Sequence, residues 1–415
     1  MAVTLLVSAC GPVPAGTELA FPAVSEHAAT ETAGETPAAS TLATPVPTAT
    51  SSAARAWTTV GSMRAPRYEH TATLLPDGRV LIVGGRGDQP GDSRAKYLDT
   101  VELFDPATAT WSPGPPMHAA RTGHLATALA DGRVLVLGGY SHVQGGFDVV
   151  RSAELYDPVT NAWATLDSPI RSRYGSSATL LRDGRVLLIT SIAFEGWDMK
   201  HRDRQRAVFL APESLTWVDG PTTDDVVGVH SAVALEGGQI LVAGGALLVG
   251  DGPPPAVNLA AVFDPETARW QAIAPMREPR LDFPLLRLLD GHVLALGGVR
   301  PEIYDPAADT WTKVDPPLSE RWSSPRAVVL DDGRVFAVGE HGTSGSLPIA
   351  ELFDASTGTW SEAGAFPVTA NMSVTRLLDG RVLVAGGYRT CYPDTGCEDD
   401  TITAEAYLFD PTALP

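Results

Sequence analysis

The chain has 415 residues, of which 49 are Asp or Glu and 30 are Lys or Arg, so its formal net charge is −19. A strongly acidic chain repels phosphates and anionic headgroups, which argues against nucleic acid and acidic membrane surfaces as partners. The 40 glycines and 34 prolines indicate many turns between short strands rather than long helices.

Residues 1–10 form a lipoprotein-like signal segment. Val7-Ser8-Ala9-Cys10 resembles the bacterial lipobox, in which small residues precede a cysteine that is lipidated after cleavage. The segment has no basic residue before its short apolar part, so a chance match or a start site further upstream is the alternative. We expect an exported bacterial lipoprotein of the cell surface or envelope, held to the membrane only through Cys10.

Residues 11–56 are rich in Pro, Thr, Ala and Ser and contain almost no large apolar side chains. Such a segment buries too little apolar surface to offset its ordering entropy, so we expect a disordered linker. No later apolar run reaches the roughly 20 residues that a transmembrane helix requires.

An apolar phrase that ends in two glycines recurs through the rest of the chain. The five full copies are 80–85, 134–139, 240–245, 293–298 and 382–387, and the two degraded copies are 186–191 and 335–340. A turn dipeptide such as Asp77-Gly78 precedes each copy, and its glycine supplies the positive φ of a tight hairpin. We expect the double glycine to let a neighbouring element approach closely. The first copy, Val80–Gly85, resembles the start of a nucleotide-binding loop, but Gly85, Gly87 and Gly91 have the wrong spacing for it.

A second phrase follows each copy. It has the form Glu-Leu-Phe-Asp-Pro, as at 102–106, with a tryptophan six residues after the Asp position. Asp caps the local amides of a turn and Pro presets its φ, so the phrase predicts a strand, a turn and a strand that opens on Trp. The repeat length of about 50 residues is that of a propeller blade.

The two ends of the chain predict how the ring closes. The last copy has Phe409-Asp410-Pro411 but stops at Pro415, before its tryptophan is due, whereas Trp57 precedes the first complete copy. We therefore expect residues 57–415 to form an all-β, seven-bladed β-propeller of four-stranded blades, with the strand at Trp57 completing the last blade.

The double glycine, the Glu-Leu-Tyr-Asp-Pro phrase at 154–158 and the phased Trp resemble the kelch-repeat family, over residues 57–415. We letter the four strands of each blade a to d in chain order. The resemblance implies that the loops joining strand d to the next strand a, and strand b to strand c, gather on one face, around the central channel where ligands usually bind. It does not decide function, because the family includes enzymes, sugar-active proteins and interaction modules.

Phased arginines precede strand a in several blades: Arg67, Arg121, Arg173, Arg280 and, one position off, Arg321. On the loop face they would form an electropositive mouth suited to carboxylates or acidic sugars. The alternative is that they pair with the phased acids Glu102, Glu154, Glu302 and Glu351 as part of the scaffold.

His70, His124 and His230 begin strand a in phase. Three histidines on neighbouring blades suggest a metal site, but no carboxylate recurs with them, so we assign them to the repeat consensus and expect no metal or other cofactor.

The long b-to-c loops are the better candidates for specificity, because irregular loops on a rigid scaffold often carry binding. We expect residues 86–100, 140–152, 191–206, 246–260 and 388–403 to be such loops, and their candidate ligand-binding aromatics include Tyr97, Tyr140, Trp197 and Tyr388. Packing of one loop on the next is the other explanation for these rings.

Cys391 and Cys397 share one loop, and their spacing suits a small disulfide in an oxidising compartment. The copper oxidases of the family, resembling galactose oxidase, need tyrosine and histidine ligands and a cysteine cross-linked to a tyrosine. Cys391 beside Tyr392 does not fit that cross-link, because sequence neighbours point to opposite sides of an extended chain.

Together these features predict a non-catalytic, monomeric propeller that binds a glycan or protein partner through its loop face. The alternative is a sugar-active enzyme of the galactose oxidase or sialic-acid mutarotase kind.

Overall fold

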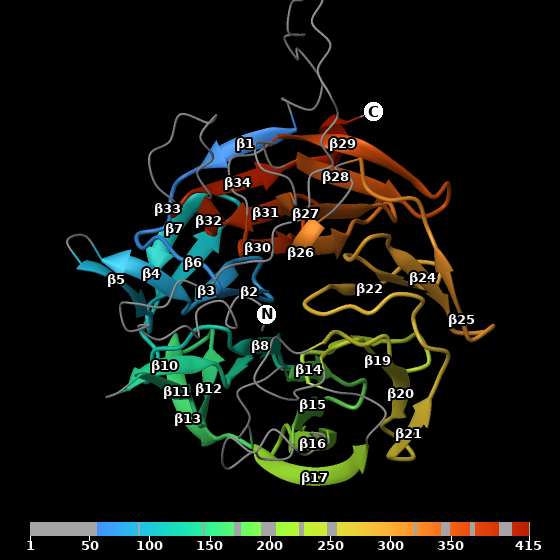
Figure 1. Cartoon of the computed structure of the whole chain (residues 1–415). Helices are drawn as coiled ribbons and strands as arrows, with labels where there is room; N and C mark the ends of the chain where they lie inside the picture. The colour runs from blue at the N-terminus through green and yellow to red at the C-terminus, as the bar shows by residue number, and fades with distance from the viewer. Residues whose placement is uncertain are drawn as a thin grey trace, which may run out of the picture.

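The computed structural model describes residues 56–89, 92–143, 146–169, 176–191, 205–223, 228–246, 255–318, 322–341, 349–365, 370–389 and 401–414. These residues form seven four-stranded antiparallel sheets arranged as a ring (Figure 1). The predicted seven-bladed propeller is confirmed. Within the described part of the chain, no helix has the length and apolar character needed to cross a membrane.

The blades follow one another in chain order. Blade 1 contains β2 (Thr71–Leu74), β3 (Val80–Val83), β6 (Val101–Asp105) and β7 (Thr110–Pro113). Blade 2 contains β8 (Leu125–Ala128), β9 (Val134–Leu137), β12 (Ser152–Asp157) and β13 (Ala162–Asp167). Blade 3 contains β14 (Ser177–Leu180), β15 (Val186–Ser191), β16 (Gln205–Ala211) and β17 (Thr216–Thr223). Blade 4 contains β18 (Ser231–Ala234), β19 (Ile240–Ala243), β20 (Ala260–Asp264) and β21 (Arg269–Ala272).

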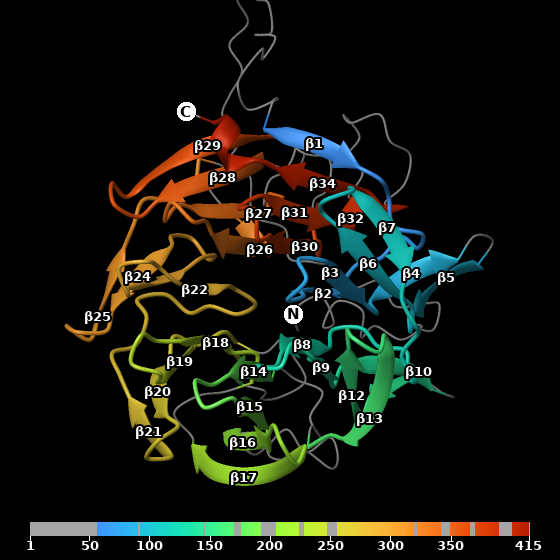
Figure 2. The same cartoon turned by 180° about the vertical axis from the view of Figure 1, so that it is seen from behind.

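The remaining blades complete the ring. Blade 5 contains β22 (Leu285–Arg287), β23 (Val293–Ala295), β24 (Glu302–Asp305) and β25 (Thr310–Lys313). Blade 6 contains β26 (Trp322–Val329), β27 (Val335–His341), β28 (Ile349–Asp354) and β29 (Thr359–Ala365). Blade 7 contains β30 (Ser373–Arg376), β31 (Val382–Ala385), β34 (Ala406–Phe409) and β1 (Trp57–Val60). The first strand of each blade lies nearest the centre and the last lies at the rim, as the view from behind also shows (Figure 2).

Blade 7 is built from both ends of the chain. Trp57 lies opposite Phe409 and Val60 opposite Ala406 in the antiparallel pair of β1 and β34. The N-terminal strand therefore closes the ring, as the position of Trp57 in the repeat predicted.

The apolar phrases form the core because both faces of each blade pack against a neighbouring blade. In β3 all four residues are buried: Val80 and Ile82 pack against blade 7, and Leu81 and Val83 pack against blade 2. A strand buried on both faces reads as a continuous apolar run rather than as an alternating pattern.

Six of the seven phased tryptophans bond to the preceding blade, whereas the indole N–H of Trp270 has no hydrogen-bond partner among the described residues. The indole N–H donates to a backbone oxygen of the preceding blade in six cases: Trp57 to Ala363, Trp111 to Gly61, Trp163 to Pro115, Trp217 to Asp167, Trp311 to Ala274 and Trp360 to Asp315. Two of these indoles also pack on the strand-c aromatic ring of their own blade. The ring centroids of Trp111 and Phe104 are 4.9 Å apart, and those of Trp163 and Tyr156 are 5.1 Å apart.

The double glycine permits close approach, as predicted. A Cβ on Gly84 would lie 2.5 Å from the carbonyl oxygen of Arg121 in the next blade, and one on Gly85 would lie 2.7 Å from that of Tyr68. Both glycines also have positive φ, at 60° and 101°.

The b-to-c loops are more regular than expected. Three of the five predicted irregular loops contain two-stranded hairpins, which pair β4 (Arg86–Gln89) with β5 (Asp92–Tyr97), β10 (Tyr140–Val143) with β11 (Gly146–Val149), and β32 (Tyr388–Arg389) with β33 (Thr401–Ile402). The expectation of irregular loops was wrong for these three, because their flanking segments continue antiparallel pairing beyond the double glycine.

Candidate functional site

The phased arginines pair with the phased glutamates inside the blades. Arg67 Nη2 lies 2.8 Å from Glu102 Oε1, and the pairs Arg121–Glu154 and Arg280–Glu302 are each 2.7 Å long. All these side chains are buried, at 3% exposure or less. The scaffold alternative is the one that the structure forms.

Each pair pins the loop from strand d to strand a. Glu102 also accepts hydrogen bonds from the backbone N–H groups of Arg64 and Ala65, at 2.8 and 3.2 Å, while Arg67 Nη1 donates to the carbonyl oxygens of Gly84 and Thr100. Burial lowers the pKa of Arg67, and the charge of Glu102 opposes that shift. The Arg67 guanidinium is thus desolvated, and its bonds are made to groups of its own blade.

The predicted electropositive mouth is therefore not formed by Arg67, Arg121 and Arg280. A ligand role for these side chains stays a prediction, and their burial beside glutamates disfavours it. Arg173 and Arg321 lie outside the described residues.

The phased histidines join neighbouring blades. Their Nε2 atoms lie 2.9, 2.8 and 2.9 Å from hydroxyl oxygens of the preceding blade, in the pairs His70–Ser373, His124–Thr71 and His230–Ser177. Burial lowers the pKa of His70 to about 3, with the charge of Arg67 as a second cause. These contacts agree with a structural role in the repeat.

The residue just before strand a forms a ring around the channel mouth. In the blades where this position is described as non-glycine it is Glu69, Val229, Asp282 or Asn371, each with left-handed φ between 48° and 63°. The N–H of Glu69 donates to the carbonyl oxygen of Asn371, and the N–H of Gly123 donates to that of Glu69, at 3.3 and 3.2 Å. Two carboxylates, Glu69 and Asp282, are thereby placed at the mouth.

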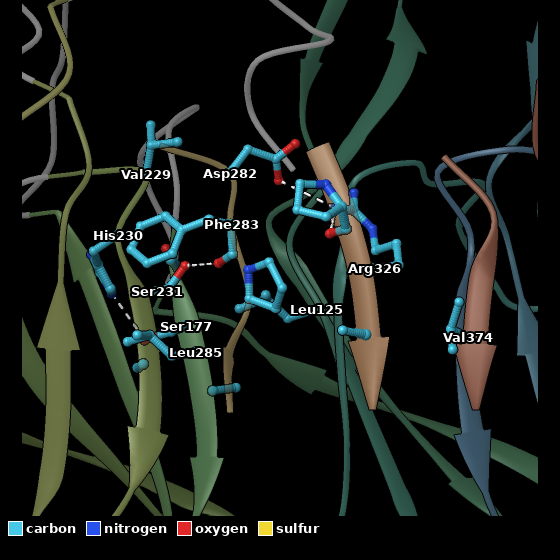
Figure 3. A pocket seen from close by; sticks show the side chains of 16 residues that line it. Leu125, Ser177, Val229, His230, Ser231, Asp282, Phe283, Leu285, Arg326 and Val374 are labelled. Carbon is cyan, nitrogen blue, oxygen red and sulfur yellow. Dashed lines mark hydrogen bonds and ion pairs between the residues drawn. The ribbon is translucent and has the colours of Figure 1, made fainter. Parts of the chain in front are cut away.

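A cavity of about 400 Å³ opens between the inner strands of blades 2 to 7. Its apolar wall includes Leu125, Phe283 and Val374, and its polar end carries Asp282 and Arg326 (Figure 3). Arg326 Nη1 lies 3.8 Å from Asp282 Oδ1 and also donates to the carbonyl oxygen of Pro325. The channel thus combines an apolar wall with one loose ion pair.

Glu69 is the second carboxylate near Arg326. It is 5% exposed, its Oε2 accepts a hydrogen bond from Thr122 Oγ1 at 3.0 Å, and its Oε1 has no hydrogen-bond partner among the described residues. Burial raises the pKa of Glu69, against the attraction of Arg86 and Arg326. Glu69 therefore links the channel to the residues around Arg86.

Arg86 stacks with three tyrosines in what we call the aromatic row: Tyr97, Arg86, Tyr68 and Tyr388. The Arg86 guanidinium carbon lies 5.4 Å from the ring centroid of Tyr68 and 5.7 Å from that of Tyr97, and the rings of Tyr68 and Tyr388 are 5.8 Å apart. All four side chains are partly exposed. Cation–π and ring contacts of this kind hold a row of flat surfaces in place.

The structure thus brings together two of the predicted aromatics, Tyr97 and Tyr388. Tyr140 is 6% exposed and packs in the core between blades 2 and 3, as the packing alternative proposed. Trp197, Cys10, Cys391 and Cys397 lie outside the described residues. Sequence reasoning missed Glu69, Asp282, Arg326, Tyr68 and Arg86, although Glu69 and Asp282 share one repeat position and differ there from their counterparts.

Comparisons of sequence and structure show which known proteins the chain resembles. A sequence model of the Kelch motif matches residues 67–118, which span blade 1 and its flanking loops. The solved "Structure of YjhT" superposes with a TM-score of 0.53 over 73% of this chain and 99% of that one, at 14% identity, which shows the fold alone. The chain is a kelch-repeat propeller.

Two curated relatives illustrate what this kelch-repeat propeller resembles. The Kelch-like protein terF of Aspergillus terreus is 32% identical over 140 residues, covering 33% of this chain and 29% of the relative. Galactose oxidase of Gibberella zeae is 24% identical over 295 residues, covering 63% of this chain and 40% of the relative. In both, the match spans less than half of the relative's length.

The residues present fit a copper site poorly. Within the described ranges, no three His, Cys, Asp or Glu side chains gather as metal ligands would. His70, His124 and His230 each use Nε2 in a bond to the neighbouring blade. The described part of this kelch-repeat propeller therefore offers no donor set on which a copper-dependent step can be built.

Proposed function

We propose that this kelch-repeat propeller is a non-catalytic binding module that recognises a glycan or a protein through its loop face. The observation that carries the proposal is the aromatic row, Tyr97, Arg86, Tyr68 and Tyr388, which lies beside the channel mouth and is partly exposed. Large aromatic and arginine side chains dominate the energetics of many interfaces.

The reasoning separates scaffold from surface. The polar side chains that recur from blade to blade make contacts within the fold. Arg121 forms an ion pair with Glu154, His124 hydrogen-bonds to Thr71, and Trp163 donates to the carbonyl oxygen of Pro115.

The aromatic row follows the repeat only in part, because Tyr388 has the position directly after the double glycine that Tyr140 has in blade 2. The channel carboxylates Glu69 and Asp282 do differ from the residues at the same position in other blades, such as Val229 and Asn371. We expect a specific partner to be recognised by residues that differ between equivalent blades.

The location of the protein is part of the proposal. The lipobox-like Val7-Ser8-Ala9-Cys10 supports export and lipidation at Cys10, with residues 11–56 as a linker to a monomeric propeller. The test is fractionation of a bacterial host: Cys10→Ser should move the protein from the membrane to the soluble fraction. Equal membrane association of both forms would contradict the lipid anchor.

The binding test uses purified protein on a glycan array and against defined candidate proteins. Tyr97→Ala and Arg86→Ala should each weaken a hit about tenfold, as expected for loss of a central aromatic or arginine contact. Leu378→Ala is the matched control, because Leu378 is 69% exposed in the a-to-b turn of blade 7, away from the b-to-c loops. Equal affinity of all three variants would refute the choice of face.

The galactose oxidase similarity over 63% of the chain favours a second candidate, a sugar-active enzyme. Copper content and hydrogen peroxide release on a galactose panel test the oxidase, and a mutarotation assay with sialic acid tests the mutarotase. Activity in either assay, lost on mutation of the channel residues, would replace the binding proposal.

A further inference from the structure

We infer that the channel mouth binds the neutral, hydroxylated end of a ligand, a sugar unit without a carboxylate, and that it discriminates against acidic sugars. The inference rests on the proposed function, because it names the ligand class that the loop face would present to the channel. It is carried by Glu69, Asp282 and Arg326 together with the apolar wall of the cavity.

The size and the wall of the cavity suit one sugar unit. A volume of about 400 Å³ is at the lower end of the range for small-ligand pockets, roughly 300–1,000 Å³. Phe283, Leu125 and Val374 give it an apolar side, and Asp282 and Arg326 give it a polar end (Figure 3). A pyranose has the same division, with an apolar ring face and hydroxyl groups around its edge.

The charges at the mouth are balanced rather than positive. Arg326 faces Asp282 at 3.8 Å, and both Arg326 and Arg86 attract Glu69 electrostatically. The arginines deeper in the loops are neutralised by their glutamates, as in Arg67–Glu102. A ligand carboxylate would thus be desolvated beside Asp282 and Glu69, and the described cations at the mouth, Arg326 and Arg86, already interact with these two carboxylates.

Hydroxyl groups meet this arrangement without a charge penalty. A hydroxyl donates one hydrogen bond and accepts others, so it can bind a carboxylate and a guanidinium at once. Glu69 Oε1 is a buried acceptor with no hydrogen-bond partner among the described residues, and a ligand hydroxyl would supply the missing donor. The observation that points to a ligand is the cavity itself, whose apolar wall meets the Asp282–Arg326 pair. Glu69 does not line this cavity and is linked to it by the charge of Arg326.

The test is calorimetry on the full-length protein with matched glycoside pairs. Methyl glucoside and methyl glucuronide differ only in CH₂OH against carboxylate, and the galactose and galacturonate pair differs in the same way. At least one neutral glycoside should bind about tenfold more tightly than its acidic counterpart. Equal or tighter binding of the acidic member, or no binding of any neutral glycoside, would overturn the inference.

Variants locate the site. Asp282→Asn and Glu69→Gln keep the shape of the side chains and should each weaken the neutral glycoside about tenfold, whereas Asp332→Asn in the opposite a-to-b turn should leave affinity unchanged. Thermal unfolding of each variant checks the fold, and Arg326→Lys provides a second probe that retains the charge. Unchanged affinity in both channel variants would exclude the mouth as the site.

The two proposals fail separately. If no glycoside binds but a larger glycan or protein does, with loss in Tyr97→Ala, the ligand class inferred for the channel is wrong and the binding function stands. If glycosides bind in the channel while Tyr97→Ala and Arg86→Ala change nothing, the channel inference stands and the aromatic row is not the recognition surface.

Discussion

Arg121 and Glu154 form an ion pair of 2.7 Å in which neither side chain is exposed to solvent. The pair joins the d-to-a loop of blade 2 to strand c of the same blade, and Glu154 also accepts hydrogen bonds from the N–H groups of His118 and Ala119. Burial alone would raise the pKa of Glu154, but the bonds from His118 and Arg121 hold it below its ordinary value. The loop face is therefore held by buried charges that are mutually satisfied.

Glu154→Ala should lower the free energy of unfolding by about 3–5 kcal/mol, because it leaves the Arg121 guanidinium buried without its partner. Arg133→Ala, which removes an exposed partner of Asp131, is the control and should cost less than about 1 kcal/mol. Urea unfolding measures both. Similar losses of unfolding free energy in the two variants would mean that the buried pair stabilises the fold no more than the exposed pair does.

Trp57→Ala should destabilise the ring by about 3 kcal/mol, since Trp57 supplies the aromatic contacts of the closing strand. Its ring lies 5.2 Å from Phe409 and 5.9 Å from Phe336, and its indole N–H donates to Ala363 of blade 6. Trp57→Phe keeps most of the ring contact and should cost less. Thermal unfolding of the two variants gives the comparison, and identical behaviour to the wild type would argue against closure through this residue.

Gly84→Ala should cost more than Gly358→Ala, although both glycines have positive φ, at 60° and 71°. Left-handed strain of about 1–2 kcal/mol applies to both. Only at Gly84 does a Cβ also meet a neighbouring blade, 2.5 Å from the Arg121 oxygen, whereas at Gly358 nothing lies within 4 Å. Chemical denaturation ranks the two, and the reverse order would show that close blade approach is not what the double glycine provides.

Acid should destabilise the propeller through its buried histidines. The pKa of His70 is lowered from 6.5 to about 3 in the folded state, chiefly by burial. As the pH falls from 6.5 towards 3, the unfolded chain takes up a proton that the folded chain does not, and stability falls by at most about 1.4 kcal/mol per pH unit for this residue. His70→Gln should remove that share of the slope in unfolding measured between pH 6.5 and 4. An unchanged slope would contradict the assignment.

Glu69 should make the free energy of unfolding change with pH in the opposite direction to His70. Burial raises its folded pKa above 4.5, so its contribution to stability is present at low pH and is lost as the pH rises through the folded pKa. Glu69→Gln should therefore unfold at a higher denaturant concentration than the wild type at pH 8, with a smaller difference at pH 4. A variant less stable than the wild type at pH 8 would show that the ionised carboxylate is well stabilised by its surroundings.

The sequence was sufficient for the architecture because propeller blades repeat local signals. The turn before each apolar run, the double glycine and the phased Trp each have one physical task, so the sequence alone assigns Trp57 to the last blade. The same repetition agrees with the contacts that the phased residues make, Arg67 with Glu102 in its own blade and His70 with Ser373 of the neighbouring blade.

The candidate site could not be predicted in the same way. Asp282 and Arg326 come from blades 5 and 6 and face one another only because the inner strands converge on the channel. The row from Tyr97 to Tyr388 likewise crosses from blade 1 to blade 7, which are distant in the chain except through ring closure. Contacts between two blades that do not recur in the other blades leave no periodic pattern in the sequence.

The pairing of β1 with β34 also sets an order of events during synthesis. The strand at Trp57–Val60 is made before any other strand of the propeller, yet its partner Ala406–Phe409 is made last. Until then the aromatic edge that Trp57 presents has no native sheet to join, while blades 1 to 6 can each form from consecutive sequence. A ribosome that stops early, or a protease that removes the final strand, would therefore leave six folded blades with an open seam on each side, an incomplete ring prone to associate with other chains.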